Sequence, residues 1–506
     1  MNGPELEQIL RDLPRRGTRV KDRPYRQVWR FEVEGKPYYL KFYPSAGVRD
    51  GFRRLFRGSP ALLEFRRLQM LQKADVPSPR AHAFLSGFNL DGEKGDAVIL
   101  EGIEPSVSLD QYLNQHELLG RPAPNRRVIG QRIRALLKKL AHGGLGHSDL
   151  HLGNLLLKDD QVYLLDAYAV HSNGLQMADL LHLAHSARQF CTTTDLVRGW
   201  RELGTSGPMP PRNTSSPGLW NRFVSRIFAD DRYFGRLTSE GWTGHFFKQA
   251  KWPRRWSAVS RMTVAAKDWE AAWPVILKQI ESDQFAVIKR RPSGDVLAGE
   301  AIIGGKPVPI VVKRPRRKYW YRYVNEIGRG MRARRAWRKA WSLVVRNVPT
   351  AWPMLLMQQR TLGYATDAII VFERVPGKTL WEADLDAMSG EERETLMRRC
   401  GRLLRRLELS GLAHGDAKAT NWIVCEDAKL GPTPVLVDVD GIRPRVLGPL
   451  GTERLLRSLR RHRQFAEADA RALREGYAPF SRVTENGAAV SGPIEGSGTG
   501  RANEAT

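Results

Sequence analysis

The chain has 506 residues, 42% of them hydrophobic, a formal net charge of +27 and three cysteines. This length exceeds what one compact core usually holds, so we expect two domains. Three cysteines at unrelated spacings exclude a disulfide framework and fit a reducing compartment, and no run approaches the ~18 apolar residues of a membrane span. The N-terminal residues also lack a signal-peptide pattern, so we expect a cytoplasmic protein.

The positive charge predicts attraction to phosphate-rich partners, which include nucleic acid, anionic lipid headgroups and polyanionic substrates. A genome-wide preference for arginine would produce the same charge without a functional cause. Composition alone leaves both explanations open.

In chain order, the first informative segment is a strand-like run at 38–43, which contains Lys41. A basic stretch follows, and then a helical pattern at 61–71 that contains Glu64, 23 residues after the lysine. Further along, an Asp lies five residues before an Asn, and a second Asp ends the next apolar run. These residues are Asp149, Asn154 and Asp166.

The middle of the chain differs in composition from both ends. Residues 207–218 are rich in Pro, Gly, Ser and Asn, as is typical of a loop. Residues 226–280 are rich in tryptophan and predict helices packed between the domains; these tryptophans are Trp242, Trp252, Trp256, Trp269 and Trp273. We therefore predict one domain at 1–225, a helical connection at 226–280, a second domain at 281–480 and a disordered tail at 481–506.

The second half repeats the order of the first. Strand-like runs at 285–289, 296–303 and 308–313 lead to Lys313, and a helical pattern covers 334–343. The polar residues that follow are Asp416, Asn421, Asp438 and Asp440. Lys41 precedes Asp166 by 125 residues, and Lys313 precedes Asp438 by the same 125. This agreement indicates a domain duplication.

Residue types in this order are typical of phosphoryl transfer, which requires alignment of a nucleophile, phosphates and Mg²⁺ more than covalent chemistry. Asp149 and Asp416 would accept a proton from the acceptor hydroxyl or orient it. Lys41 and Lys313 would contact the nucleotide phosphates, with Glu64 holding Lys41. Hard oxygen ligands suit Mg²⁺, and the candidates are Asn154, Asp166, Asn421 and Asp438.

Each residue taken alone has a simpler interpretation. A single Asp-x-x-x-x-Asn is usually a turn or a helix cap, and a lone Lys in a strand usually lies at an edge. We expect His147 and His414 to brace the loop backbone. Asp440 is either a metal-proximal carboxylate or a turn residue, and Asp179 either supports the first loop or caps a helix.

These segments resemble the kinase-like superfamily, and specifically the bacterial lipopolysaccharide core kinases that phosphorylate heptose or Kdo sugars. The resemblance rests on the two loops, on the segments around Lys41 and Glu64, and on 332–343 and 348–353. It implies an α+β fold of two tandem bilobal protein-kinase-like domains, each with a small antiparallel-sheet N-lobe and a mostly helical C-lobe. It also implies ATP, Mg²⁺ and a lipid-linked sugar acceptor at the cytoplasmic face of the inner membrane.

The sequence departs from protein kinases in both loops, where Ser148 and Gly415 replace the Arg that usually precedes the catalytic Asp. Regulated protein phosphorylation is therefore not expected. The position that corresponds to Glu64 in the second half is Ala336, so Lys313 requires another partner, for which Glu326 is a candidate. We favour the first domain as the active one and leave the second undecided.

Basic residues concentrate in three places: twelve lie from Lys313 to Lys339, a smaller group lies at 49–57 after the first strand lysine, and a helical cluster lies at 454–463. Either an anionic bilayer or a polyanionic glycan would bind them, and a solvated helix face is the simpler reading. Two other functions remain open. One is a nucleic-acid-binding platform that lacks catalysis, and the other is a phosphotransferase for a compound such as choline or an aminoglycoside. No recognised nucleic-acid module is present, and the basic charge disfavours a cationic acceptor.

Overall fold

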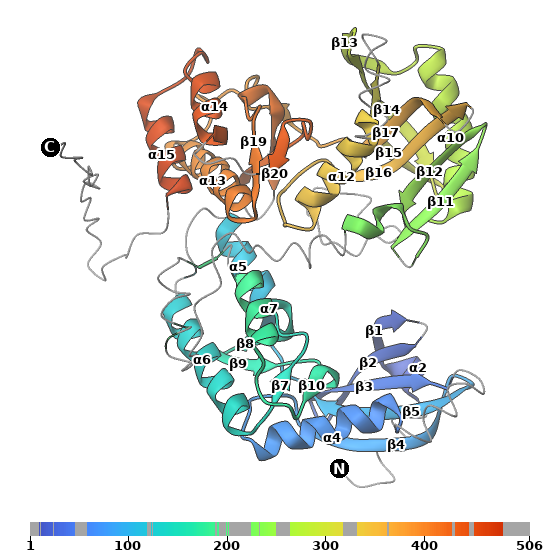
Figure 1. The fold of residues 1–506 in the computed structure, drawn as a ribbon, viewed down its shortest axis with the longest axis vertical. Coiled ribbons are helices and arrows are strands. Elements are labelled where there is room, and N and C mark those ends of the chain that lie inside the picture. Colours follow the sequence, from blue (N-terminus) through green and yellow to red (C-terminus); the bar gives the residue numbers. More distant parts are fainter. Residues whose placement is uncertain are drawn as a thin grey trace, which may run out of the picture.

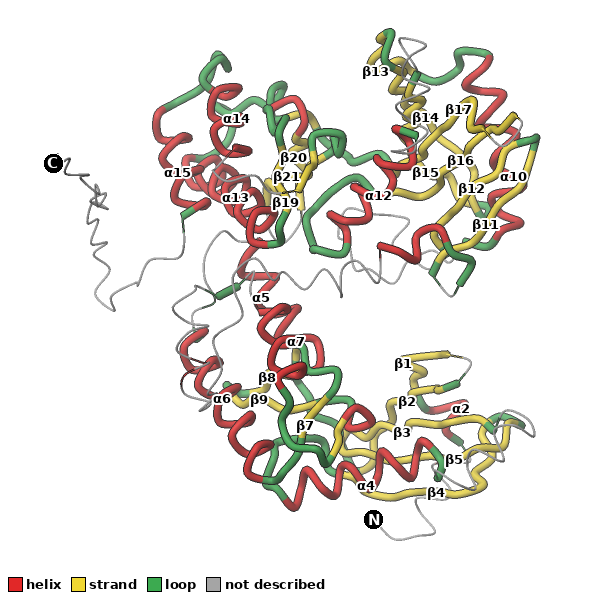
Figure 2. The backbone as a smooth tube through the Cα atoms, in the orientation of Figure 1, coloured by secondary structure: helices red, strands yellow, loops and turns green. Residues whose placement is uncertain are grey.

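The computed structural model describes residues 10, 12–23, 25–45, 58–118, 123, 125–187, 190–191, 199, 201, 224–231, 233–248, 264–316, 331–361, 364–427, 431–444 and 450–478. Figure 1 shows helices and strands in both halves of the chain, and Figure 2 shows the same path by element type. Several predicted features lie outside the described residues: the loop at 207–218, Trp252, Trp256, Glu326, the part of the basic run at 317–330, and the tail from 481.

The first half opens on a five-stranded antiparallel sheet in the order β1-β2-β3-β5-β4. Its strands are β1 (Thr18–Arg23), β2 (Arg26–Val33), β3 (Lys36–Pro44), β4 (Ala81–Leu90) and β5 (Glu93–Glu101), and the short helix α2 (Leu13–Arg16) precedes them. Side chains alternate between the faces of a strand, so Leu40 and Phe42 of β3 enter one core while Lys41 and Tyr43 point to the opposite face. Helix α4 (Pro60–Lys73) contacts the sheet, and Ser59 caps its first turn.

The rest of the first half is mainly helical, with two small sheets of order β6-β8-β9 and β10-β7. The helices are α5 (Leu109–Leu118), α6 (Arg126–His142) and α7 (Met177–Ala187), with 3-10 turns η1 (Leu152–Asn154) and η2 (Ala167–Ala169). The strands are β6 (Val107–Ser108), β7 (Gly146–His147), β8 (Leu155–Lys158), β9 (Gln161–Leu164) and β10 (Val170–His171).

The segment expected to be helical contains a β-hairpin as well as a helix, so the prediction was wrong for residues 234–247. A 3-10 turn, η3 (Arg226–Phe228), precedes β11 (Phe234–Ser239) and β12 (Trp242–Phe247), and only α10 (Ala266–Glu281) is a long helix. Glu240 and Gly241 both have positive φ, 51° and 73°, as a two-residue hairpin turn requires. The tryptophan content obscured this short alternating pattern, which carries the hairpin signal.

The second half contains a seven-stranded antiparallel sheet in the order β11-β12-β16-β17-β15-β14-β13. Its further strands are β13 (Ala286–Arg291), β14 (Gly294–Ile303), β15 (Lys306–Pro315), β16 (Pro353–Thr361) and β17 (Tyr364–Glu373). Read from β13, the first five positions repeat the strand order of the first sheet, and β12 and β11 extend the edge at β16. Helix α12 (Arg332–Val344) corresponds to α4 and contacts β15, β16 and β17.

The small sheets also recur, as β18-β20-β21 and β19-β22. Their strands are β18 (Lys378–Thr379), β19 (Leu412–His414), β20 (Trp422–Asp427), β21 (Gly431–Leu436) and β22 (Ile442–Pro444). Helices α13 (Gly390–Leu409), α14 (Leu450–Leu459) and α15 (Glu467–Tyr477) complete this half, with the 3-10 turn η5 (Ala419–Asn421). Helix α13 contacts α5 of the first half.

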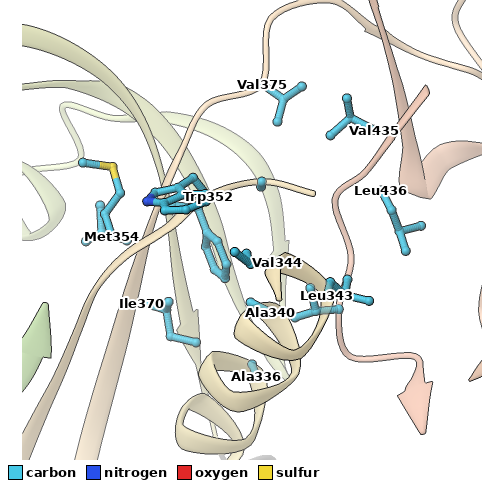
Figure 3. Packing of buried hydrophobic residues seen from close by; sticks show 14 of the residues in the cluster. Ala336, Ala340, Leu343, Val344, Trp352, Met354, Ile370, Val375, Val435 and Leu436 are labelled. Atoms are coloured by element: carbon cyan, nitrogen blue, oxygen red, sulfur yellow. The ribbon is translucent and has the colours of Figure 1, made fainter. Parts of the chain in front are cut away.

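The core of the second half is unusually aromatic. Trp337 and Trp341 of α12 are fully buried, and Trp341 packs edge-on against Trp352 with a ring-centroid separation of 5.1 Å. Figure 3 shows Ala336, Ala340 and Val344 on α12 among the apolar side chains of this cluster. Trp273 of α10 packs against Trp242 of β12 at 5.4 Å, so β12 and α10 share one core with the second sheet.

No helix within the described ranges is both long and apolar enough to cross a membrane. The cysteines form no disulfide among the described residues, and two of them, Cys400 and Cys425, are buried.

Candidate active site

In the first half a buried carboxylate joins the sheet to helix α4. Lys41 Nζ forms an ion pair with Glu64 Oε1, and the Tyr43 hydroxyl donates to Glu64 Oε2 at 2.5 Å. Glu64 is 0% exposed. Lys41 and Tyr43 reach the same carboxylate because they lie two residues apart on β3 and therefore point to the same face.

Arg26 connects this cluster to Asp166. Its guanidinium interacts with Tyr43 and with Glu64, and its Nη1 lies 3.5 Å from Asp166 Oδ1. Burial raises the pKa of Tyr43 well above its usual range, and the charge of Glu64 adds to this, so the phenol remains a donor. Arg26 therefore links the Lys41–Glu64 pair to Asp166, although these residues are far apart in the sequence.

The β8–β9 hairpin brings the Asn and the second Asp together. Leu155 pairs with Leu164 across the hairpin, so Asn154 immediately precedes one strand and Asp166 lies just beyond the other. The Leu165 amide donates to the Asn154 carbonyl at 2.8 Å, which closes the open end of the hairpin.

Asn154 also fixes the catalytic-loop Asp. Its Nδ2 donates to the Asp149 carbonyl at 2.8 Å and to Asp149 Oδ2 at 3.2 Å. The approach of His151 Nε2, 3.6 Å from Asp149 Oδ2, lowers the pKa of Asp149 to about 2 despite partial burial, and His182 at 3.9 Å adds to the effect. Asp149 is therefore a fully ionised and weakly basic group at neutral pH.

His147 braces the loop backbone, as predicted. Its Nε2 donates to the Leu165 carbonyl at 3.1 Å, and burial lowers the pKa of the ring, which keeps it neutral. Asp179 supports the first loop, and it is the third residue of α7 and not its N-cap. It accepts from the His147 amide at 3.3 Å and, at the start of α7, from the Gln176 amide at 3.1 Å.

The oxygen atoms near Asp166 suit a hard cation. Asp166 adopts a left-handed conformation with φ 57°, and its buried Oδ1 makes no hydrogen bond among the described residues, although Arg26 Nη1 lies 3.5 Å away as an ion-pair partner. Since Asn154 donates through its nitrogen, its amide oxygen points away from that bond and is available as a ligand. No cluster of three His, Cys, Asp or Glu side chains that could hold a metal occurs within the described ranges. Magnesium is commonly held by one or two carboxylates together with substrate phosphates, so these residues fit Mg²⁺ bound with a nucleotide.

The second loop repeats the Asn-to-Asp contact of the first and also has a buried histidine that contacts the following strand end. His414 Nε2 donates to the Asp438 carbonyl at 2.8 Å, which confirms its bracing role, and His414 Nδ1 accepts from the Asp416 amide at 3.1 Å. Asn421 Nδ2 donates to the Asp416 carbonyl at 2.7 Å. Asp416 faces Lys418 at 3.1 Å and Arg454 at 3.9 Å, where Asp149 faces two histidines.

The strand lysine of the second half has a different partner. Ala336 is the fifth residue of α12, as Glu64 is of α4, and it is buried in the apolar core. Lys313 Nζ instead donates to the Val437 carbonyl at 3.2 Å and lies 3.6 Å from Asp438 Oδ1. Although burial alone raises the pKa of Asp438, the charge of Lys313 and the Asp440 amide lower it overall.

Asp440 belongs to an ion pair at the start of α12. Its Oδ2 accepts from Arg332 Nε at 3.0 Å, and its carbonyl accepts from Lys339 Nζ at 2.7 Å. These contacts agree with the interpretation of Asp440 as a turn residue and not with a metal-proximal carboxylate.

Sequence reasoning missed Arg26, Tyr43, His151 and His182. Tyr43 carried a usable signal, because it lies two residues after Lys41 in the same predicted strand. Arg26 and His182 carried none, since only the fold places them beside the two aspartates.

The chain matches the model of the lipopolysaccharide kinase (Kdo/WaaP) family over residues 7–189 and 319–477. It is 23% identical over 143 residues to the lipopolysaccharide core heptose(I) kinase WaaP of Escherichia coli strain K12, a match that covers 26% of this chain and 51% of the relative. A second Escherichia coli WaaP has the same identity and coverage. The chain thus spans about half the length of the curated relatives it matches.

Solved structures with partial likeness include WaaP in complex with acyl carrier protein, with 20% identity and a TM-score of 0.31 over 39% of this chain and 81% of that one. WbdD matches with 17% identity and a TM-score of 0.24, over 34% of this chain and 36% of its own. The BubR1 kinase domain matches with 14% identity and a TM-score of 0.24, over 31% of this chain and 46% of its own. Because the family model covers more than half of the sequence, this chain belongs to the lipopolysaccharide kinase (Kdo/WaaP) family.

Proposed function

We propose that this chain is an ATP-dependent kinase that phosphorylates a sugar hydroxyl, on heptose or Kdo, of the lipopolysaccharide core or a similar lipid-linked glycan. The proposal includes two tandem bilobal kinase-like domains, at 1–225 and 281–480, and action at the cytoplasmic face of the inner membrane. Its main support is the convergence of Lys41, Glu64, Asp149, Asn154 and Asp166 in the first half.

In this proposal Lys41, oriented by Glu64, contacts the nucleotide phosphates. Asn154 and Asp166 hold Mg²⁺, which supplies charge neutralisation on the transferring phosphoryl group when it is bound with ATP. Asp149 accepts a hydrogen bond from the acceptor hydroxyl. Its low pKa makes it a weak base, so it orients the hydroxyl more than it deprotonates it, which is adequate for a loose phosphoryl-transfer transition state.

Catalysis is assigned primarily to the first half. In the second half, Lys313 is held by the carboxylate that would serve as the Mg²⁺ ligand, and α12 has no acidic residue to replace Glu64. Binding of Mg²⁺ at Asp438 would compete with Lys313 for the same oxygen atoms. We therefore propose that Asp416, Asn421 and Asp438 form a weaker catalytic site or one that only binds nucleotide.

The test uses purified full-length protein with ATP, Mg²⁺ and core oligosaccharide acceptors, and it compares wild type with Asp149→Asn and Asp416→Asn. We expect Asp149→Asn to lower transfer at least about 100-fold, because the acceptor loses its orienting carboxylate. We expect Asp416→Asn to retain most of the activity. Equal losses in both variants would contradict the assignment to one half. Absence of transfer by wild type, with tight and salt-sensitive RNA binding, would favour a nucleic-acid platform.

A further inference from the structure

The two strands that only the second half possesses create a pocket outside the candidate active site. Strands β11 and β12 extend the sheet beyond β16, and α12 contacts the sheet at β15, β16 and β17. The pocket lies between this added edge and α12 and has a volume of about 390 Å³. Figure 1 shows β11 and β12 in green beside α12 in yellow. The first sheet ends at β4, so the first half has no strands equivalent to these two among its described residues.

Strand register places the polar residues of this wall on one face. Arg236 pairs directly with His245, and Thr238 pairs with Thr243, which pairs in turn with Gln358. Arg360 follows two residues after Gln358 on β16. Residues that pair directly, or that differ by two along a strand, point to the same side of a sheet.

Three arginines line the pocket, one each from β11, α12 and β16: Arg236, Arg334 and Arg360. Among the described residues none of the three has a carboxylate within ion-pair distance. Asp230 is close enough to act on His245, but it is already paired with Lys248 Nζ at 2.5 Å. Proteins usually pair or disperse such charges, so this concentration of unpaired guanidinium groups requires a physical explanation.

Aromatic contacts hold part of the cluster in place. The Arg334 guanidinium lies 4.2 Å from the ring centroid of Phe228, and that ring packs edge-on against His245 at 5.6 Å. Arg338, one turn further along α12, approaches the same ring at 5.7 Å. Stacking on an aromatic face restrains a guanidinium without neutralising it, so Arg334 keeps its charge and its donors for a ligand.

The pocket also contains a buried polar atom that makes no hydrogen bond among the described residues. His245 Nδ1 is buried and has no hydrogen-bond partner among the described residues. Gly244 has no room for a side chain, because a Cβ atom there would lie 1.9 Å from the backbone carbonyl oxygen of Leu356. Backbone atoms therefore line the pocket at Gly244, and the side chains of Arg236 and Arg360 are exposed to solvent.

We propose that this pocket binds a phosphate ester, either a phosphomonoester or a diphosphate carried on a compact polar group such as a sugar. A phosphate ester carries nearly two negative charges at neutral pH, and guanidinium groups bind its oxygens bidentately. The volume lies within the range of small-ligand sites, and the hydroxyls of Thr238 and Thr243 provide further donors. The site does not depend on the kinase assignment, because it contains none of the candidate catalytic residues.

The experiment is calorimetric titration of the full-length protein with inorganic pyrophosphate, glucose 1-phosphate, AMP and uncharged glucose. The variants are Arg236→Gln/Arg360→Gln in the pocket and Arg374→Gln, an exposed arginine outside it, as the matched control. A second control, Lys41→Met/Lys313→Met, removes phosphate binding at the candidate nucleotide sites. The glucose 1-phosphate and AMP arms distinguish a sugar carrier from a nucleotide carrier.

We expect wild type and both controls to bind glucose 1-phosphate or pyrophosphate and not glucose, and the pocket variant to bind at least about 10-fold more weakly. Without phosphate, the pocket variant should unfold at the same temperature as wild type or higher, because like-charge repulsion is relieved. Unchanged affinity in the pocket variant would overturn the proposal, as would an equal loss in Arg374→Gln. A kinase that is inactive but still binds glucose 1-phosphate through these arginines would refute the proposed function and leave this site intact.

Discussion

At the scale of single residues, Glu64 is the most constrained group of the candidate site. It is fully buried, and it accepts from both Lys41 and Tyr43. Removal of either donor would leave an oxygen of the buried carboxylate without a partner. The stability contributions of the three side chains are therefore coupled.

Glu64→Gln is expected to destabilise the first half by about 3 kcal/mol, because it removes one charge of a buried ion pair. Tyr43→Phe should cost about 1 kcal/mol, the value of one hydrogen bond. Thermal and urea unfolding would measure both. Glu32→Gln, which breaks the surface pair with Arg30, is the matched control and should change stability by at most about 1 kcal/mol. A Glu64→Gln protein as stable as this control would contradict the importance of the buried pair.

The two loop histidines predict how stability depends on pH. Burial lowers the pKa of His147 and of His414 in the folded protein. The unfolded chain therefore binds protons more readily, and the free energy of unfolding should decrease as pH falls below about 6.5. Protonation of His414 would also abolish the hydrogen bond that its Nδ1 accepts from Asp416.

The check is urea unfolding at pH 7 and pH 5 for wild type and for His147→Gln/His414→Gln. The variant should lose less stability than wild type between these two values. Asp149 does not contribute there, because its pKa is lowered to about 2 and its effect is lost only as pH falls from about 4 towards that value. An equal loss in both proteins would assign the pH dependence to other groups.

At the scale of elements, the β11–β12 hairpin changes the second half more than any other difference between the halves. It lengthens the sheet, supplies Trp242 to the core and builds one wall of the arginine pocket. Helix α10 covers these strands, with Trp273 fully buried against them.

Trp273→Ala should destabilise the second half by about 3–5 kcal/mol, the usual cost of removing a buried tryptophan. Because the core of the first half contains no residue of α10, its unfolding transition should stay in place. Differential scanning calorimetry resolves the two transitions, and Val275→Ala, at an exposed position of the same helix, is the control. If both transitions moved together, the two halves would be one cooperative unit.

At the scale of the whole molecule, positive charge gathers on the exposed side of α14 and the turn after it. Leu455, Leu456 and Leu459 are buried, and the basic residues between and beyond them are exposed: Arg454, Arg457, Arg460, Arg461 and Arg463. One of these, Arg454, is near the loop carboxylate Asp416. A basic face beside a candidate site supports the proposed attachment to anionic membrane.

Arg454→Gln/Arg457→Gln/Arg460→Gln should weaken sedimentation with phosphatidylglycerol vesicles about 100-fold, at roughly 1 kcal/mol for each arginine near the surface. The control removes three exposed basic residues of α6 and should have a smaller effect: Arg127→Gln/Arg132→Gln/Lys138→Gln. Vesicle binding should also weaken steeply as salt is raised. Equal losses in the two triple variants would indicate attraction through net charge alone.

The sequence by itself predicted a duplication and located the strand lysines, the two Asp-to-Asn loops and the following aspartates. These are local patterns, and their spacing can be read without knowledge of the fold. The repeated strand order and the repeated loop contacts agree with them. Ala336 in place of Glu64 was likewise visible from spacing alone, and the structure places both at the fifth position of their helices.

Only the tertiary structure decided which side chains surround those patterns. Arg26 reaches Asp166, His182 approaches Asp149, and Lys313 turns to Asp438 because separate elements pack at particular angles. The three arginines of the pocket likewise come from three elements, one of which, β11, was expected to be helical. Contacts of this kind depend on where strands and helices meet in space, and residue order along one chain does not encode that directly.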